Sequence, residues 1–149
     1  MNYWLMKSEP ETFGIDDLKK MKVDHWDGVR NYQARNFMKD MKKNDLIFFY
    51  HSNCKPPGIV GIMEVKKEAY PDFTSYDKKS SYYDPKSSPE NPRWFMVDVK
   101  FKEKFSEMIS LDTLKTVPAL KDLALVRRGN RLSIMPVSAK DWQTILKLR

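Results

Sequence analysis

The sequence contains few of the residues that most often carry out enzyme chemistry. Its 149 residues include one cysteine, Cys54, and two histidines, His25 and His51. A single thiol excludes an internal disulfide and a zinc site built from cysteine pairs. We therefore expect no bound metal and no cofactor. The setting is expected to be reducing: the cytoplasm, or the nucleus if the source is eukaryotic.

Glycine-rich phosphate loops and long apolar runs are also lacking. The five glycines are dispersed along the chain, and the pair Gly58 and Gly61 has no helix behind it. No stretch approaches the roughly 18 apolar residues of a membrane span. The N-terminal stretch lacks the basic start and apolar block of a signal peptide. The sequence therefore predicts neither membrane association nor secretion.

Cys54 and His51 are the only pair that suggests a nucleophile and its base. Their spacing shows no third group to orient the base, and neighbouring residues of a strand point to opposite faces. We expect a histidine at a strand end and a buried thiol, with no catalytic residue in the chain.

Basic residues are abundant. Lysine and arginine number 27 against 20 acidic residues, which gives a formal net charge of +7. Such a charge suits a polyanionic partner, although lysine-rich surfaces also promote solubility. The 41% hydrophobic content can form one sizeable core, and the length fits a single domain over residues 1–149. A monomer is expected, with a weak dimer as the alternative.

Hydrophobic patterns predict a strand-rich chain with short helices. The apolar stripe Ala34, Phe37, Met38 and Met41 has helical spacing. Ser138 and Asp141 are spaced as in a helix cap. The predicted strands are Tyr3–Lys7, Asp45–His51, Gly58–Val65, Trp94–Phe101 with one face buried, and Arg131–Val137. The predicted helices are Ile15–Met21, Asn31–Met41, short helices within Ser110–Leu125 broken near Pro118, and a final helix after Ser138.

These connections are too short for regular parallel crossovers, so the sequence predicts an α+β fold with a mixed, mainly antiparallel curved sheet. The segment Tyr70–Arg93 is long and irregular but contains five aromatic residues. Such a segment is usually functional, and its aromatic content argues against disorder. We expect it to be ordered and to close over a site through Tyr82 or Tyr83.

The stretch His25–Met38 combines an indole, a phenol, amides and two guanidinium groups. Gly28 allows a turn, and Asn31 stands where the cap of the following helix is expected. The helix start, together with Arg30 and Arg35, can receive a phosphate. Trp26 offers a face on which a base can stack, outside the helical stripe, so its loss is expected to harm binding more than folding. A structural reading, with Trp26 in the core and Asn31 only a cap, remains open.

The sequence resembles the EVE domain family of the PUA-like superfamily, which includes the thymocyte nuclear protein group and small bacterial relatives. The resemblance covers almost the whole chain. It rests on the segments Tyr3–Pro10, Trp26–Asn36, Phe49–Asn53, Pro57–Gly61, Tyr83–Ser87, Pro92–Trp94 and Arg131–Val137.

This resemblance implies a curved, barrel-like mixed sheet with helices around it, similar to the YTH domain that holds a methylated adenine. It also implies a non-enzymatic module that binds a modified base, chiefly a modified cytosine in DNA, with RNA as a further target. Together with the local chemistry it gives the expected base-binding residues: Lys7, Ser8, Trp26, Arg30, Asn31, Tyr32, Arg35, Asn36, Ser52, Asn53, Tyr82, Tyr83, Arg131 and Ser133.

Two other functions remain open at this level. One is an enzyme acting on a nucleotide or a modified base, with the His51–Cys54 region in its pocket. The other is a general PUA-type RNA-binding accessory domain with no preference for a modification.

Overall fold

One mixed sheet of six strands organises the molecule. The computed structural model describes residues 1–149, and the strands lie in the order β2-β5-β4-β3-β1-β6. The pair β1/β3 is parallel and the other pairs are antiparallel. The strands are β1 (Tyr3–Ser8), β2 (Val23–His25), β3 (Leu46–His51), β4 (Gly58–Pro71), β5 (Phe95–Ser110) and β6 (Ile134–Val137). The mixed sheet predicted from the sequence is confirmed, and it is open because β2 and β6 are its edges.

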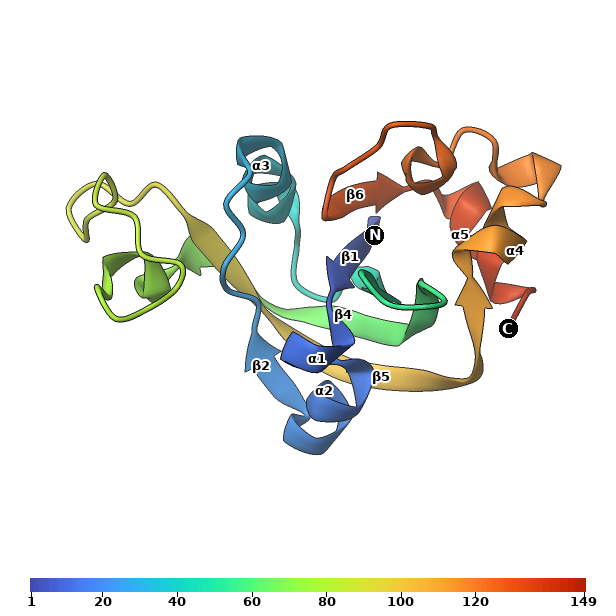
Figure 1. Ribbon diagram of the computed structural model, residues 1–149, viewed down its shortest axis with the longest axis horizontal. Helices are drawn as coiled ribbons and strands as arrows, with labels where there is room; N and C mark the ends of the chain where they lie inside the picture. The colour runs from blue at the N-terminus through green and yellow to red at the C-terminus, as the bar shows by residue number, and fades with distance from the viewer.

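Short helices surround this sheet. Figure 1 shows α4 and α5 together at one end and the yellow-green segment between β4 and β5 at the other. None of the helices is long and apolar enough to cross a membrane. The helices are α1 (Pro10–Phe13), α2 (Ile15–Met21), α3 (Tyr32–Asp40), α4 (Leu111–Lys115) and α5 (Ala139–Leu146), with 3-10 turns η1 (Phe73–Tyr76), η2 (Pro118–Leu120) and η3 (Ala124–Val126).

The sheet is buried on both faces. Successive residues of its central strands point to opposite sides, so Phe49 belongs to one apolar cluster and Phe48 to the other. Trp142 of α5 stacks on Phe48 at 3.8 Å between ring centroids and covers the second face. The first face is covered by α2 and α3, which bury Leu18 and Met38 completely. This explains why β1 and β3 read as continuous apolar runs.

Helix α3 forms as its sequence predicts. The Asn31 side chain accepts a hydrogen bond from the Ala34 N–H at 2.9 Å and so caps the helix. Ala34, Met38 and Met41 are fully buried, and Phe37 packs against the same cluster. The cap of α5 at Ser138 is likewise confirmed, because the Ser138 hydroxyl accepts from the Asp141 N–H at 3.0 Å.

Several predicted strand limits are wrong. Strand β4 continues through Tyr70 to Pro71 and β5 continues to Ser110, because the charged second half of each strand pairs with the more apolar first half of the other strand, across register shifts. The single buried face predicted for Trp94–Phe101 is also wrong, since Met96 and Val97 are both fully buried. The three-residue strand β2 was not predicted.

Strand β6 begins at Ile134 rather than at Arg131. The preceding residues are held in a loop by Asn130, whose amide donates to the Ala124 carbonyl at 2.7 Å and accepts from the Leu132 N–H at 3.0 Å. These side-chain hydrogen bonds compete with the sheet ladder.

Candidate functional site

A cavity of about 470 Å³ opens where β1 and β2 end. We name it the Trp26 cavity. It is lined by Lys7, Ser8, Glu9, Thr12, Phe13, Asp24, His25, Trp26, Asp27, Gly28, Val29, Arg30, Tyr82 and Ser133. Its volume lies within the roughly 300–1,000 Å³ typical of sites for small molecules. The structure therefore brings together six of the expected residues: Lys7, Ser8, Trp26, Arg30, Tyr82 and Ser133.

Trp26 belongs both to the cavity wall and to the core. Its side chain is 7% exposed and packs edge-on against Phe13 and Phe49, with ring centroids 6.1 and 5.4 Å away. The backbone N–H of Trp26 donates to the Val97 carbonyl at 2.8 Å, which extends the pairing of β2 with β5 by one residue. Of the two readings that the sequence left open, the structure favours the one with Trp26 in the core, because this residue belongs to the larger apolar cluster.

Tyr82 covers the cavity above Gly28. Gly28 has a φ of +84°, which favours glycine, and a Cβ built there would lie 2.6 Å from the Tyr82 ring. The position therefore requires glycine for two reasons: its backbone conformation and its contact with the tyrosine. Tyr83 does not line the cavity and is 37% exposed. Of the two tyrosines proposed to wall the site, the structure places Tyr82 there.

We expect Gly28→Ala to displace Tyr82 and to loosen this cover. Gly129→Ala is a matched control, since Gly129 has a φ of +80° but nothing within 4 Å of a built Cβ. Both variants incur the backbone penalty of about 1–2 kcal/mol, and only Gly28→Ala adds the steric clash. Thermal unfolding should therefore show a larger loss for Gly28→Ala. Equal losses of thermal stability in the two variants would mean that the Tyr82 ring can move aside at no energetic cost.

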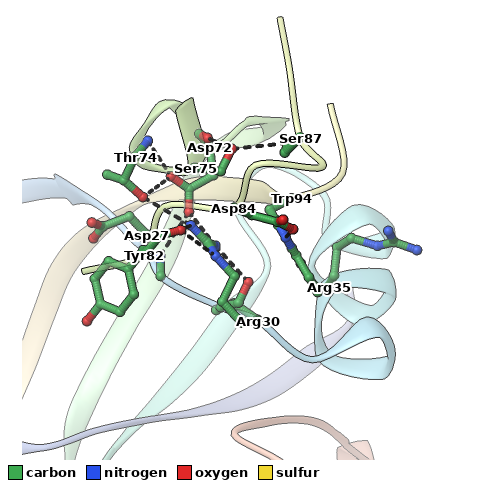
Figure 2. A network of polar contacts seen from close by, with 12 residues as sticks. Asp27, Arg30, Arg35, Asp72, Thr74, Ser75, Tyr82, Asp84, Ser87 and Trp94 are labelled. Atoms are coloured by element: carbon green, nitrogen blue, oxygen red, sulfur yellow. Dashed lines mark hydrogen bonds and ion pairs between the residues drawn. The ribbon is translucent and has the colours of Figure 1, made fainter. Parts of the chain in front are cut away.

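Arg30 is fully engaged within the protein, as Figure 2 shows. Its Nε and Nη2 donate to the Tyr82 carbonyl at 3.0 and 2.7 Å, and Nη1 donates to Asp72 and to the Val29 carbonyl at 3.1 and 2.9 Å. A further bond from Nη2 reaches Thr74 at 3.3 Å. A guanidinium has five N–H donors, and all five are used. Contrary to the expectation, Arg30 has no donor left for a phosphate. It holds in place the segment of residues 72–94, which we name the covering segment.

Asp72 is the partner that sequence reasoning missed. It is fully buried and accepts hydrogen bonds from the Gly28 N–H at 2.9 Å, from Arg30, and from Thr74. The Asp72 carboxylate thus ties the covering segment to the turn after β2, 44 residues away in the chain. The sequence does not reveal this role, because a lone aspartate after a strand resembles an ordinary turn residue and its partners lie more than 40 residues away.

The rest of the segment is ordered, as predicted. The Ser75 hydroxyl donates to the Asp72 carbonyl at 2.8 Å and lies at hydrogen-bonding distance, 3.1 Å, from the Ser87 hydroxyl. The Trp94 indole N–H donates to Asp84 at 2.7 Å, and this bond is the main cause that lowers the pKa of Asp84 below its ordinary value. The segment is therefore held by a polar network as well as by its aromatic rings.

Four expected residues of the α3 region lie outside the cavity lining. Asn31 serves as the helix cap, and Tyr32 stacks on Trp94 with centroids 4.9 Å apart. Arg35 lies over the Tyr32 ring at 4.9 Å and donates to the Arg93 carbonyl and to Asn36. Tyr32 is 52% exposed, so this cluster presents an accessible aromatic and cationic surface beside the covering segment.

Three more expected residues are also not part of the lining. The Ser52 N–H donates to the Ser8 carbonyl at 3.0 Å, and the Asn53 amide donates to Glu9 at 3.3 Å. Both residues therefore stabilise the turn after β1 by hydrogen bonds. Arg131 is exposed in the loop that leads to Ser133.

Acidic groups surround the opening, and the sequence reasoning did not select them. Asp24, Asp27 and Glu9 all line the cavity. The Asp27 carboxylate is 32% exposed and lies 4.0 Å from the His25 imidazole. Lys7 and Arg30 are basic residues of the same lining, and burial lowers the pKa of Lys7 from its ordinary value. The site thus pairs apolar walls with acceptors and one amine.

His51 and Cys54 form no nucleophile–base pair. The His51 Nε2 accepts the Ile15 N–H at 3.1 Å, and the Cys54 thiol donates to the Pro56 carbonyl at 3.5 Å. Neither lines the Trp26 cavity, and the expectation of a buried thiol is wrong, since Cys54 lies in an exposed loop and is only partly buried. Burial lowers the pKa of His51, which keeps its ring neutral and able to accept from α2.

The chain matches the model of the EVE domain over residues 2–148. It is 49% identical to thymocyte nuclear protein 1 of Danio rerio over 97% of this chain and 71% of that protein. It is also 49% identical to protein PSPTO5229 of Pseudomonas syringae, whose crystal structure superposes with a TM-score of 0.96 over 98% of both chains.

A third relative is the human THYN1 protein, whose crystal structure was determined in complex with 5-methylcytosine-containing DNA. It is 46% identical, with a TM-score of 0.93 over 99% of this chain and 97% of that one. These likenesses confirm the PUA-like fold class. With its length matched almost completely and its sheet superposed on those of its relatives, this chain belongs to the EVE domain family.

Proposed function

We propose that this protein is a non-enzymatic module that binds nucleic acid and receives one modified base in the Trp26 cavity. A modified cytosine in DNA is the preferred ligand, in keeping with the 5-methylcytosine-containing DNA bound by human THYN1. The observation that carries the proposal is the pairing of a Trp26 and Phe13 wall with the carboxylates of Asp24 and Asp27 in one cavity.

The cavity chemistry suits a cytosine. The exocyclic amine of cytosine is a hydrogen-bond donor, and Asp or Glu carboxylates are its usual acceptors. Aromatic side chains stack with bases of any kind, at about 1–3 kcal/mol per base. A methyl group on the ring gains about 0.8 kcal/mol when it fills apolar space. Polar groups would therefore select the base, and the apolar wall would select the modification.

The test compares matched single-stranded DNA oligonucleotides that differ only in one central cytosine. We expect the 5-methylcytosine strand to bind about fourfold more tightly, the ratio that corresponds to one buried methyl group. Fluorescence anisotropy or calorimetry measures both affinities. The same pair in RNA tests the wider target.

A matched variant assigns the preference to the cavity. Asp27→Asn removes an acceptor for the amine and keeps the shape of the side chain, so cytosine binding should weaken at unchanged thermal stability. Equal affinity for methylated and unmethylated strands in the parent protein would refute the preference for this modification and favour a general nucleic-acid-binding domain.

The non-enzymatic assignment rests on what lies at the cavity. A covalent mechanism needs a nucleophile in contact with a base. The His51 ring already accepts from the backbone of α2. The His25 ring lines the cavity but has only the carboxylates of Asp24 and Asp27 beside it, with no hydroxyl or thiol bonded to it. We propose that modified nucleosides incubated with the protein are recovered unchanged.

A further inference from the structure

A second and larger cavity, of about 730 Å³, lies beside α4 and the two 3-10 turns that follow it. We name it the basic cavity. Its floor is apolar and includes the buried Tyr50 ring, and its rim holds Lys115, Lys121, Arg127 and Arg128. Apart from Lys7, none of its lining residues belongs to the lining of the Trp26 cavity.

The charge of the basic cavity has one sign. No acidic side chain is present among its 14 lining residues. The side chains of Lys115, Lys121, Arg127 and Arg128 form no ion pair and no hydrogen bond within the protein. In contrast, Arg30 and Arg35 use their donors internally. Four cations without a partner inside the protein therefore line the basic cavity, where an anion is favoured.

The floor adds a second requirement for the ligand. Burial raises the pKa of Tyr50 to about 12, so its phenol stays neutral and can donate a hydrogen bond. An apolar floor under a cationic rim suits a group with a flat or apolar body and a negative charge. A nucleotide unit, with its base and its phosphate, has that composition.

The two cavities are neighbours. Lys7 lines both of them, and its ammonium lies 5.6 Å from the centre of the Tyr50 ring. The loop before β6 also borders both, through Arg127 to Asn130 on the basic cavity and Ser133 on the Trp26 cavity. Figure 1 shows this orange-red loop arching back over β6 from the side of α4 and α5.

We propose that the basic cavity binds a phosphate-bearing nucleotide that neighbours the base held in the Trp26 cavity, on the same strand of nucleic acid. The strand then runs along the loop of residues 127–133 and passes Lys7. This inference rests on the proposed binding of nucleic acid. It assigns the phosphate contacts to Lys115, Lys121, Arg127 and Arg128, in place of Arg30.

The test uses the double variant Arg127→Gln/Arg128→Gln. Both side chains are exposed, so folding should be unaffected. The control is Lys19→Gln/Lys20→Gln, which removes the same charge from exposed positions on α2 away from both cavities. The probes are a strand of about ten nucleotides with one 5-methylcytosine, its unmethylated match, and free 5-methyl-dCMP.

We expect the arginine variant to bind both strands on the order of tenfold more weakly at 50 mM salt, and its log affinity against log salt to flatten by about 1.4. Free 5-methyl-dCMP should bind all three proteins alike. The lysine control should match the parent protein within about twofold, since it loses only long-range attraction that salt screens.

Equal affinities of the arginine variant and the lysine control for the strands would overturn the inference. An equal loss for free 5-methyl-dCMP would also overturn it, because the basic cavity would then hold a free nucleotide. If the parent protein does not prefer the methylated strand, yet the arginine variant weakens binding to both strands, the path of the strand stands and only the proposed base preference fails.

Discussion

Trp26→Ala should lower the free energy of unfolding by about 3–5 kcal/mol, the usual loss when a buried tryptophan is truncated. The side chain fills space between Phe13 and Phe49 and is 7% exposed. Its loss enlarges the Trp26 cavity into the core, so binding of a base should fail together with stability. Denaturant unfolding followed by circular dichroism measures the first effect.

Trp26→Phe separates the two roles. A phenyl ring keeps most of the apolar contact while it reduces the area for stacking. We expect this variant to lose less stability than Trp26→Ala and still to bind the base more weakly than the parent protein. A stable Trp26→Ala variant that folds normally would show that Phe13 and Phe49 close the gap by themselves.

Asp72→Ala should cost about 3–5 kcal/mol, because it removes one partner of a buried ion pair and leaves the other uncompensated. Arg30 is 22% exposed and the Asp72 side chain is fully buried, so water cannot fully replace the lost carboxylate. The Gly28 N–H and Thr74 also lose their acceptor. The covering segment should then detach, which limited proteolysis between residues 72 and 94 would detect.

Asp77→Ala is the matched control for this prediction. Asp77 lies in the same segment but is exposed, and its carboxylate accepts only from the Lys79 N–H at 2.9 Å. Its loss should change stability by about 0.5 kcal/mol at most. If Asp72→Ala unfolds at the same denaturant concentration as Asp77→Ala, the ion pair between Asp72 and Arg30 contributes nothing to the free energy of unfolding.

Much of the fold follows from local patterns. The stripe of α3 and its Asn31 cap are readable because residues three and four positions apart share one helix face. The outer halves of β4 and β5 are not readable in this way. Their charged residues resemble loop sequence, and they form strands because each of them pairs with the more apolar first half of the other strand. Strand β2 has three residues, too few for any pattern.

The site is predictable in its composition and less so in its geometry. Trp26, Lys7 and Tyr82 were expected at the site, and they do line one cavity. Arg30 was expected to face a ligand, but its direction is set by Asp72 and the Tyr82 carbonyl, which lie 42 and 52 residues away. Such long-range partners leave no trace in a short segment. The carboxylate of Asp27 in the cavity lining was likewise not expected from the sequence.

The two edge strands of the sheet bear on whether copies of this protein aggregate with one another. Strands β2 and β6 have three and four residues, and β6 contains Pro136, which has no N–H to offer. Beyond β2, the outer part of β5 carries Lys102 and Lys104. Short edges, proline and lysine are the features that prevent edge-to-edge pairing and amyloid-like growth. The open sheet should therefore resist aggregation without closing into a barrel, and partner chains cannot extend it by adding a strand.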